Sequence, residues 1–162
     1  MQLPDIITLN EYGGDFNSYI EAVYEIFKND FVHSKPVFDG VTLKLKKHPI
    51  TDGRECTFYH LTHEGQDEQN REPDMRRMER IGFIRPMIEN FACPVLRVWR
   101  NTRGRHERIL IFHEEESYLV ILEDRVEYIL PWTAYYIQHD SRKKRLITEY
   151  NEYIKTKTAQ GH

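Results

Sequence analysis

Three stretches of the chain repeat apolar residues every three to four positions, which is the spacing of an amphipathic helix. They are residues 15–31, 74–92 and 141–155. The first can be capped by Asp15 or Asn17, the second by Asp74 and the third by Ser141. Pro86 lies inside the second stretch and should kink it, because proline removes a backbone donor from a helix.

Other stretches alternate apolar and polar residues, which is typical of strands. Residues 34–49 indicate a strand, a turn and a strand, with Val41, Leu43 and Leu45 alternating with polar residues. After the turn TDGR, the run ECTFYHLT (55–62) returns as the next strand. These segments predict a β-hairpin. Four later runs separated by short polar turns predict an antiparallel meander. They are residues 94–101, 107–114, 117–124 and 127–138.

The element order is therefore helix, hairpin, helix, four strands and helix. It predicts an α+β fold in which helices pack on one face of a four-stranded antiparallel meander, with an N-terminal helix and a β-hairpin in addition. The 162 residues suit one compact domain. Within it, residues 1–36 form an N-terminal helical elaboration, residues 37–155 form the main unit, and the tail 156–162 is expected to fray.

Composition excludes several classes of protein. No run approaches the ~18 consecutive apolar residues of a membrane span, and the N-terminus lacks the pattern of a secretory signal. Cys56 and Cys93 are the only cysteines and lack zinc-ligand spacing, so we expect two buried, reduced thiols in a cytoplasmic protein. The dinucleotide, phosphate-loop, HExxH and GxSxG motifs are absent from the sequence.

Charge is segregated along the chain, although the net charge is only −3. Nine arginines lie between positions 76 and 108 against three glutamates, whereas six acids lie between positions 114 and 127 against one arginine. A local arginine surface on a weakly charged protein favours contact with anions at one place.

The second helical stretch carries the first candidate site, in RRMER. Arg77 and Arg80 share a helix face, as do Arg76 and Arg80, and Arg77 borders the apolar stripe. Guanidinium groups bind phosphate bidentately, so these residues could line an anion cleft. The alternative is a solvated helix face with local ion pairs.

The run LRVWRNTRGRHER carries the second candidate. A predicted hairpin tip carries Arg103, Arg105, His106 and Arg108, with Arg100 nearby, and could contact a phosphate backbone, while Trp99 could stack on a base. The alternative is an exposed basic hairpin with a tryptophan in the core.

A histidine and two hydroxyl residues complete the candidates. His60 lies in the predicted strand FYHLT on the same face as Phe58, where it is either structural or at the edge of a site. Thr133 and Tyr135 share one face of the last predicted strand and could donate hydrogen bonds to phosphate, or could belong to a tyrosine-rich core.

The combination of FYHLT, RRMERIGFIRPMIEN, YLVIL and LPWTAYYI resembles a phage- and toxin-associated branch of the barnase–EndoU–colicin–RelE-like ribonucleases. The resemblance covers about residues 37–153 and rests on pattern and element order. It implies helices beside a four-stranded antiparallel sheet, and a nuclease unit over residues 37–155. It also implies cleavage of RNA without metal or other cofactor, by attack of the ribose 2′-hydroxyl on the adjacent phosphate.

Transferred to this chain, the resemblance assigns catalysis to His60, Arg77, Arg80, Thr133 and Tyr135, and RNA binding to Arg76, Trp99, Arg100, Arg103 and Arg105. It leaves the general acid open among His48, His113 and His139. The expected partners are RNA and an acidic antitoxin protein, with no membrane. The alternative is a non-catalytic member of the same fold that binds RNA or protein.

Overall fold

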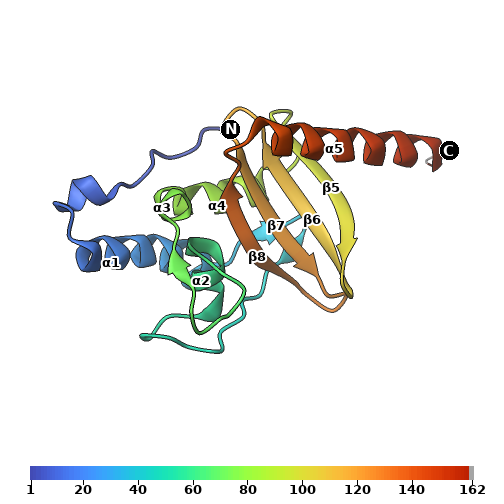
Figure 1. The fold of residues 1–162 in the computed structure, drawn as a ribbon. Coiled ribbons are helices and arrows are strands. Elements are labelled where there is room, and N and C mark those ends of the chain that lie inside the picture. Colours follow the sequence, from blue (N-terminus) through green and yellow to red (C-terminus); the bar gives the residue numbers. More distant parts are fainter. Residues whose placement is uncertain (161–162) are drawn as a thin grey trace.

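The first half of the chain is mainly helical in the computed structural model, which describes residues 1–160 (Figure 1). A 3₁₀ turn, Leu9–Tyr12, precedes helix α1 (Phe16–Phe27), which continues as a π-helical turn over Lys28–Val32. Next come the hairpin of β1 (Val37–Phe38) and β2 (Val41–Thr42), helix α2 (Cys56–Thr62), and the hairpin of β3 (His63–Glu64) and β4 (Glu72–Pro73). Helix α3 (Met75–Glu79), the 3₁₀ turn Ile81–Phe83 and helix α4 (Ile84–Glu89) complete this half.

The second half is one antiparallel sheet followed by a long helix. Strands β5 (Leu96–Arg103), β6 (His106–His113), β7 (Tyr118–Asp124) and β8 (Ile129–Tyr136) pair in sequence order. Each is antiparallel to the next. Helix α5 (Asp140–Gln160) closes the described chain. The predicted α+β class and four-stranded meander are thus confirmed.

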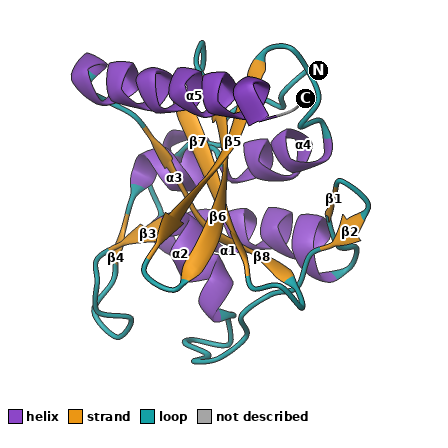
Figure 2. Cartoon of the chain, turned by 90° about the vertical axis from the view of Figure 1, so that its right-hand side faces the viewer, coloured by secondary structure: helices purple, strands orange, loops and turns teal. Residues whose placement is uncertain are grey.

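The sheet has a helix-covered core on each face. One face contributes residues such as Ile109, Ile111 and Val120 to a cluster with the buried side chains of α1 to α4. The opposite face contributes Trp99 and Leu110, among others, to a smaller cluster with α5. The prediction that the helices pack on one face of the sheet therefore holds for α1 to α4 only, because α5 lies across the other face (Figure 2).

The N-terminal helix is part of the larger core. The Asp15 side chain accepts a hydrogen bond from the Ser18 backbone N–H, so Asp15 is the cap. Tyr19, Val23 and Phe27 are fully buried in the same cluster as the sheet residues. The N-terminal 36 residues thus share their hydrophobic core with the rest of the chain.

Residues 56–62 form a helix, so the strand predicted there is wrong. Six of the seven side chains of α2 are buried, which means that the apparent alternation did not report exposure. A short apolar run of this length cannot be assigned to helix or strand from periodicity alone. The hairpin that does form is the shorter β1–β2 pair, which turns at Asp39 and Gly40 with φ of 47° and 80°. An Asp-Gly turn with two positive φ angles suits a tight hairpin.

The predicted helix 74–92 is divided in two. Asp74 caps α3 as expected, accepting from the backbone N–H groups of Arg76 and Arg77. The interruption falls at the 3₁₀ turn Ile81–Phe83, one turn before Pro86 rather than at it. A proline ring clashes with the carbonyl four residues earlier, which here belongs to Gly82. Pro86 itself lies in the first turn of α4, where proline is tolerated.

The C-terminal helix is longer than predicted. It begins at Asp140 instead of having Ser141 as its cap, and it runs to Gln160, so residues 156–160 are helical rather than frayed. Its sequence contains no glycine or proline, and the Lys157 ammonium donates to the Tyr153 hydroxyl at 3.1 Å across one turn. Residues 161–162 of the predicted tail lie outside the described residues. Within residues 1–160, no helix has the length and apolar character needed to cross a membrane.

Candidate anion-binding site

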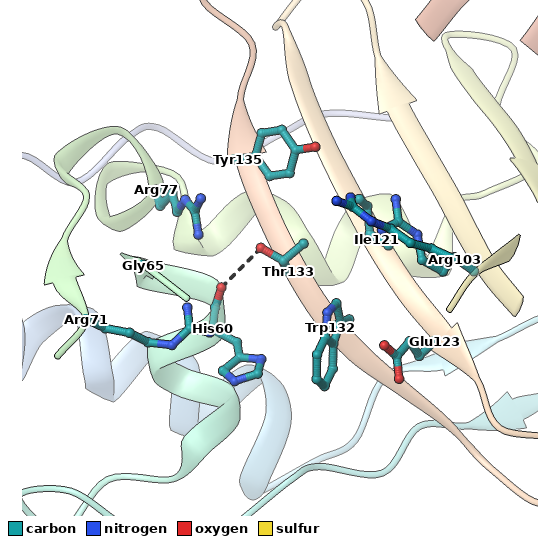
Figure 3. A pocket seen from close by; sticks show the side chains of 11 residues that line it. His60, Gly65, Arg71, Arg77, Arg103, Ile121, Glu123, Trp132, Thr133 and Tyr135 are labelled. Atoms are coloured by element: carbon teal, nitrogen blue, oxygen red, sulfur yellow. Dashed lines mark hydrogen bonds between the residues drawn. The ribbon is translucent and has the colours of Figure 1, made fainter. Parts of the chain in front are cut away.

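A pocket of about 300 Å³ opens between the helices and the sheet face that α5 covers. Its walls come from α2, α3, the segment 65–71 and all four strands of the sheet. Figure 3 shows Arg71 and Arg77 on the helical side, Arg103 on the sheet side, and residues of β8 between them. We call it the arginine pocket, and it is lined by His60, Gly65, Arg71, Arg77, Arg103, Arg108, Ile121, Glu123, Trp132, Thr133 and Tyr135.

A bulge in β8 brings consecutive residues to the same pocket. Ile121 pairs with Thr133 but Leu122 pairs with Pro131, so Trp132 is an extra residue on the β8 side. Neighbours in a regular strand point to opposite faces, whereas a bulge redirects a side chain. Trp132 and Thr133 therefore both line the pocket.

Helix α2 is fixed against β8 at this point. The Thr133 hydroxyl donates to the His60 carbonyl at 3.3 Å, and the His60 ring meets the Trp132 ring edge-on at a centroid distance of 4.6 Å (Figure 3). Thr133 thus positions His60 by holding its backbone.

Arg108 is the most unusual residue of the pocket. Its residue surface is only 8% exposed, and among residues 1–160 its Nε has no hydrogen-bond partner. The carboxylate opposite it on β7, Glu123, instead pairs with Arg125 at 2.8 Å. A buried charge without a partner is costly, so an arginine kept in this state indicates a missing anion.

The other arginines differ in how firmly the fold holds them. Arg77 donates to the His63 carbonyl at 2.6 Å, and its Nε lies 3.1 Å from the Asp74 carboxylate. In the described part of the chain, neither Arg71 nor Arg103 forms an ion pair, and the Arg71 Nε is buried without a partner. One arginine is therefore fixed by the protein, while Arg71, Arg103 and Arg108 keep donors for a ligand.

Mutual repulsion adds to the cost of these charges. Burial and then the neighbouring Arg103 lower the pKa of Arg108. Burial also lowers the pKa of Arg71, and the nearby Arg77 acts in the same direction. An anion would relieve both effects, and planar guanidinium groups match the oxygens of a phosphate.

His60 is buried and neutral in this setting. Its residue surface is 4% exposed, and burial, followed by Arg71, lowers its pKa. The His60 Nε2 lies 3.1 Å from the Glu68 carboxylate. Lys46, whose ammonium lies 2.8 Å from the same oxygen, is the main reason that the pKa of Glu68 falls to about 2. Since Glu68 is ionised, neutral His60 donates from Nε2 and keeps Nδ1 as a proton acceptor.

The same neighbourhood could offer ligands to a metal ion. One ligand atom each from Cys56, His60 and Glu68 lies within 4.8 Å of the other two. Cys56 and Cys93 are both free thiols, but only Cys56 is buried as expected, whereas Cys93 is partly exposed. The Lys46 ammonium already forms an ion pair with the Glu68 oxygen at 2.8 Å. Burial raises the pKa of the Cys56 thiol. Both features oppose a bound cation, since a thiol ligand must be deprotonated.

Of the predicted site residues, five line the arginine pocket: His60, Arg77, Arg103, Thr133 and Tyr135. The predicted convergence with Arg80 does not occur. Arg80 pairs with Glu79 at 3.0 Å and stacks over Tyr136, on the other face of the sheet. Helix α3 ends at Glu79, so Arg77 and Arg80 do not continue on one helical face.

The remaining predicted RNA-binding residues lie outside the pocket. Arg76 is exposed over the Tyr136 ring, and Arg105 is exposed in the turn between β5 and β6. Arg100 pairs with Glu107 and Asp124 at 3.0 and 2.9 Å. Trp99 is 1% exposed beneath α5 and bonds to Glu149, so it cannot stack on a base without unpacking the helix.

Six lining residues were not assigned to the site: Gly65, Arg71, Arg108, Ile121, Glu123 and Trp132. Of these, Arg108 was placed on the predicted basic hairpin tip. The sequence could have indicated Arg108 as a site residue, because the strand pattern places this charged residue among residues that the sheet buries. Arg71 lies in an acidic stretch that indicated only a loop, and Trp132 depends on a bulge that a strict alternation does not contain. Among the candidate general acids, His48 is exposed, His113 is buried and accepts from the Glu116 N–H at 3.1 Å, and His139 lines a neighbouring pocket.

Acidification is expected to destabilise the fold through His63. Burial, followed by Arg71, lowers the pKa of this histidine to about 4. Between pH ~6.5 and 4 the unfolded chain binds a proton that the folded chain excludes, so stability is complete above pH ~6.5 and is lost as pH falls. At about 1.4 kcal/mol per pKa unit, the loss approaches ~3 kcal/mol.

Urea unfolding at pH 7, 5.5 and 4 measures this effect. The His63→Gln variant should lose less stability over this range than the wild type, whereas His33→Gln, at an exposed position, should behave like the wild type. An equal loss in all three proteins would contradict the assignment to His63.

Comparisons with known proteins gave no match: no family model, no curated protein and no solved structure matches this chain. The resemblance to the barnase–EndoU–colicin–RelE-like ribonucleases therefore stays a prediction.

Proposed function

We propose that this protein is a metal-independent endoribonuclease of the toxin type, and that the arginine pocket binds the phosphate at which RNA is cut. The proposal is carried by one observation: the buried, unpartnered Arg108 lies in a single pocket with Arg71, Arg77 and Arg103, next to a neutral histidine. This combination supplies positive charge for the phosphate, and a proton acceptor, without a bound metal ion.

The reaction uses the residues in distinct ways. The His60 Nδ1 takes the proton of the ribose 2′-hydroxyl, while Glu68 holds the ring through Nε2. The 2′-oxygen bonds to phosphorus, the bond from phosphorus to the 5′-oxygen breaks, and the leaving oxygen takes a proton from water. The products are a 2′,3′-cyclic phosphate and a 5′-hydroxyl end. Arg71, Arg103 and Arg108 stabilise the charge that develops on the phosphate oxygens.

A second candidate function is binding without cleavage. It is favoured by the 4% exposure of His60 and by its bond to Glu68, both of which restrict access to the ring. In that case the same arginines hold RNA or an acidic protein. An acidic antitoxin that covers the pocket suits either function, because it would complement the arginine charge.

Cleavage of total RNA by the full chain is expected to proceed in EDTA and to leave 2′,3′-cyclic phosphate ends. The reason is that the pocket supplies its positive charge from arginines. The His60→Gln variant should cleave at least ~100-fold more slowly, since a general base typically contributes about 10²–10⁴-fold. Gel analysis with end-group mapping measures both results.

Two controls make this experiment decisive. A wild-type-like thermal midpoint shows that His60→Gln is folded, and His33→Gln, at an exposed position, should cleave like the wild type. Activity that vanishes in EDTA and returns with magnesium would refute the mechanism. RNA binding without any cleavage would select the second candidate.

A further inference from the structure

A second pocket of about 300 Å³ adjoins the arginine pocket across β8. The two pockets share Arg77 and Tyr135. On its far side the second pocket is lined by His139 and by Arg142 of α5. The two pockets therefore meet at a common wall, and each presents arginine to the space it encloses.

Tyr135 forms that wall, and an arginine touches it from each side. The Arg77 guanidinium carbon lies 5.4 Å from the ring centroid, and the Arg142 Nη2 donates to the hydroxyl at 3.2 Å. Within residues 1–160, Arg142 forms no ion pair and makes no other side-chain hydrogen bond. A guanidinium carries five N–H donors, so most of those on Arg142 remain free for a ligand.

The acidic residues of the second pocket do not cancel this charge. The Asp74 carboxylate is engaged by the backbone N–H groups of Arg76 and Arg77 and by the Arg77 Nε at 3.1 Å. Glu64 is exposed and forms no ion pair in the described part of the chain. Glu64 is thus the one lining carboxylate that would weaken anion binding.

We propose that the second pocket binds the phosphate adjacent to the one in the arginine pocket, so that the ligand is a single strand carrying at least two phosphates. This inference rests on the proposed function, because it takes the arginine pocket as the first phosphate site. Successive phosphates occupy the two pockets, with Arg77 and Tyr135 between them. A mononucleotide fills only one of them.

The test compares two ligands that cannot be cleaved by 2′-hydroxyl attack. One is a 5′-phosphorylated thymidine dinucleotide with two phosphates, and the other is thymidine 5′-monophosphate. Calorimetry with the full chain in low salt should show at least ~10-fold tighter binding of the dinucleotide. Each phosphate contact on a single strand should also add ~0.7 to the slope of log affinity against log salt.

Arg142→Gln should remove most of the dinucleotide advantage and leave the monophosphate affinity unchanged. Arg145→Gln, an exposed arginine one turn further along α5, should have little effect on either ligand. Glu64→Gln should strengthen dinucleotide binding. Thermal unfolding verifies that each variant is folded.

The outcomes separate this inference from the proposed function. If Arg142→Gln and Arg145→Gln behave alike while wild-type RNA cleavage persists, the second subsite is wrong and the ribonuclease stands. If wild type binds the dinucleotide as the two-pocket arrangement predicts but cleaves no RNA, the ribonuclease is wrong and the subsite stands. Equal affinity of wild type for both ligands would overturn the subsite by itself.

Discussion

Replacing Arg108 with methionine is expected to lower RNA cleavage by about 1,000-fold and at the same time to stabilise the protein. Removing one preorganised donor to a developing oxyanion typically costs about 10²–10³-fold in rate. Methionine matches the aliphatic stem of arginine and has no charge, and Arg108 is 8% exposed with an unpartnered Nε. Replacing buried charge by packed apolar atoms can stabilise a fold by about 1–4 kcal/mol. Single-turnover cleavage and urea unfolding measure the two effects.

The opposite signs of these effects separate a binding role from a structural one. If the role of Arg108 were structural, its substitution would destabilise the protein, and RNA cleavage would fall because less protein is folded. Arg108→Lys keeps the charge but not the planar fork, so it should retain part of the activity. Arg145→Met, at an exposed position, serves as the matched control. Loss of stability in Arg108→Met would remove the argument for a missing anion.

Trp99→Ala is expected to destabilise the protein by about 3–5 kcal/mol, as is typical for truncation of a large buried aromatic residue. Trp99 is 1% exposed, packs edge-on against Tyr150 of α5 and donates to Glu149 of the same helix. Its loss removes the contacts that Trp99 makes with Tyr150 and Glu149 of α5. Chemical unfolding monitored by circular dichroism measures the change.

A more conservative substitution at the same position tests whether Trp99 binds RNA. Trp99→Phe keeps most of the packing and should keep wild-type RNA affinity, because the indole lies beneath α5 rather than in either pocket. A large loss of affinity in folded Trp99→Phe would restore the stacking role predicted from the sequence.

The strands of the sheet could be predicted because their sequences carry both required signals. The run YLVIL (118–122) is continuously apolar, and short polar turns lie on both sides of the strand. All residues of this strand from Tyr118 to Glu123 are buried between two helical layers. The second layer was not predicted, since the low apolar content of α5 gave no indication of which face it would cover.

The site was only partly predictable, because three of its determinants are not local. His60 was placed on a strand, and only tertiary burial makes its segment a helix. Arg71 reaches the pocket from a segment whose composition indicates a solvated loop. Trp132 and Thr133 share the pocket through a bulge that depends on pairing with β7. Arg77 and Tyr135 were found because the start of the helix at Asp74 and the last strand were both predicted correctly.

The segment 65–71, which connects β3 to β4, contains two side chains that act at different places, Glu68 and Arg71. Glu68 holds the ring of His60, and Arg71 extends into the arginine pocket. The short β3–β4 pairing, at His63↔Pro73 and Glu64↔Glu72, and a hydrogen bond from the Asp74 N–H to the Thr62 carbonyl hold the ends of this segment together. An anion that attracts Arg71 therefore also acts on the position of Glu68. If the proposed function is correct, we expect ligand binding and the alignment of His60 to be thermodynamically linked, with the ring best aligned when the pocket is full.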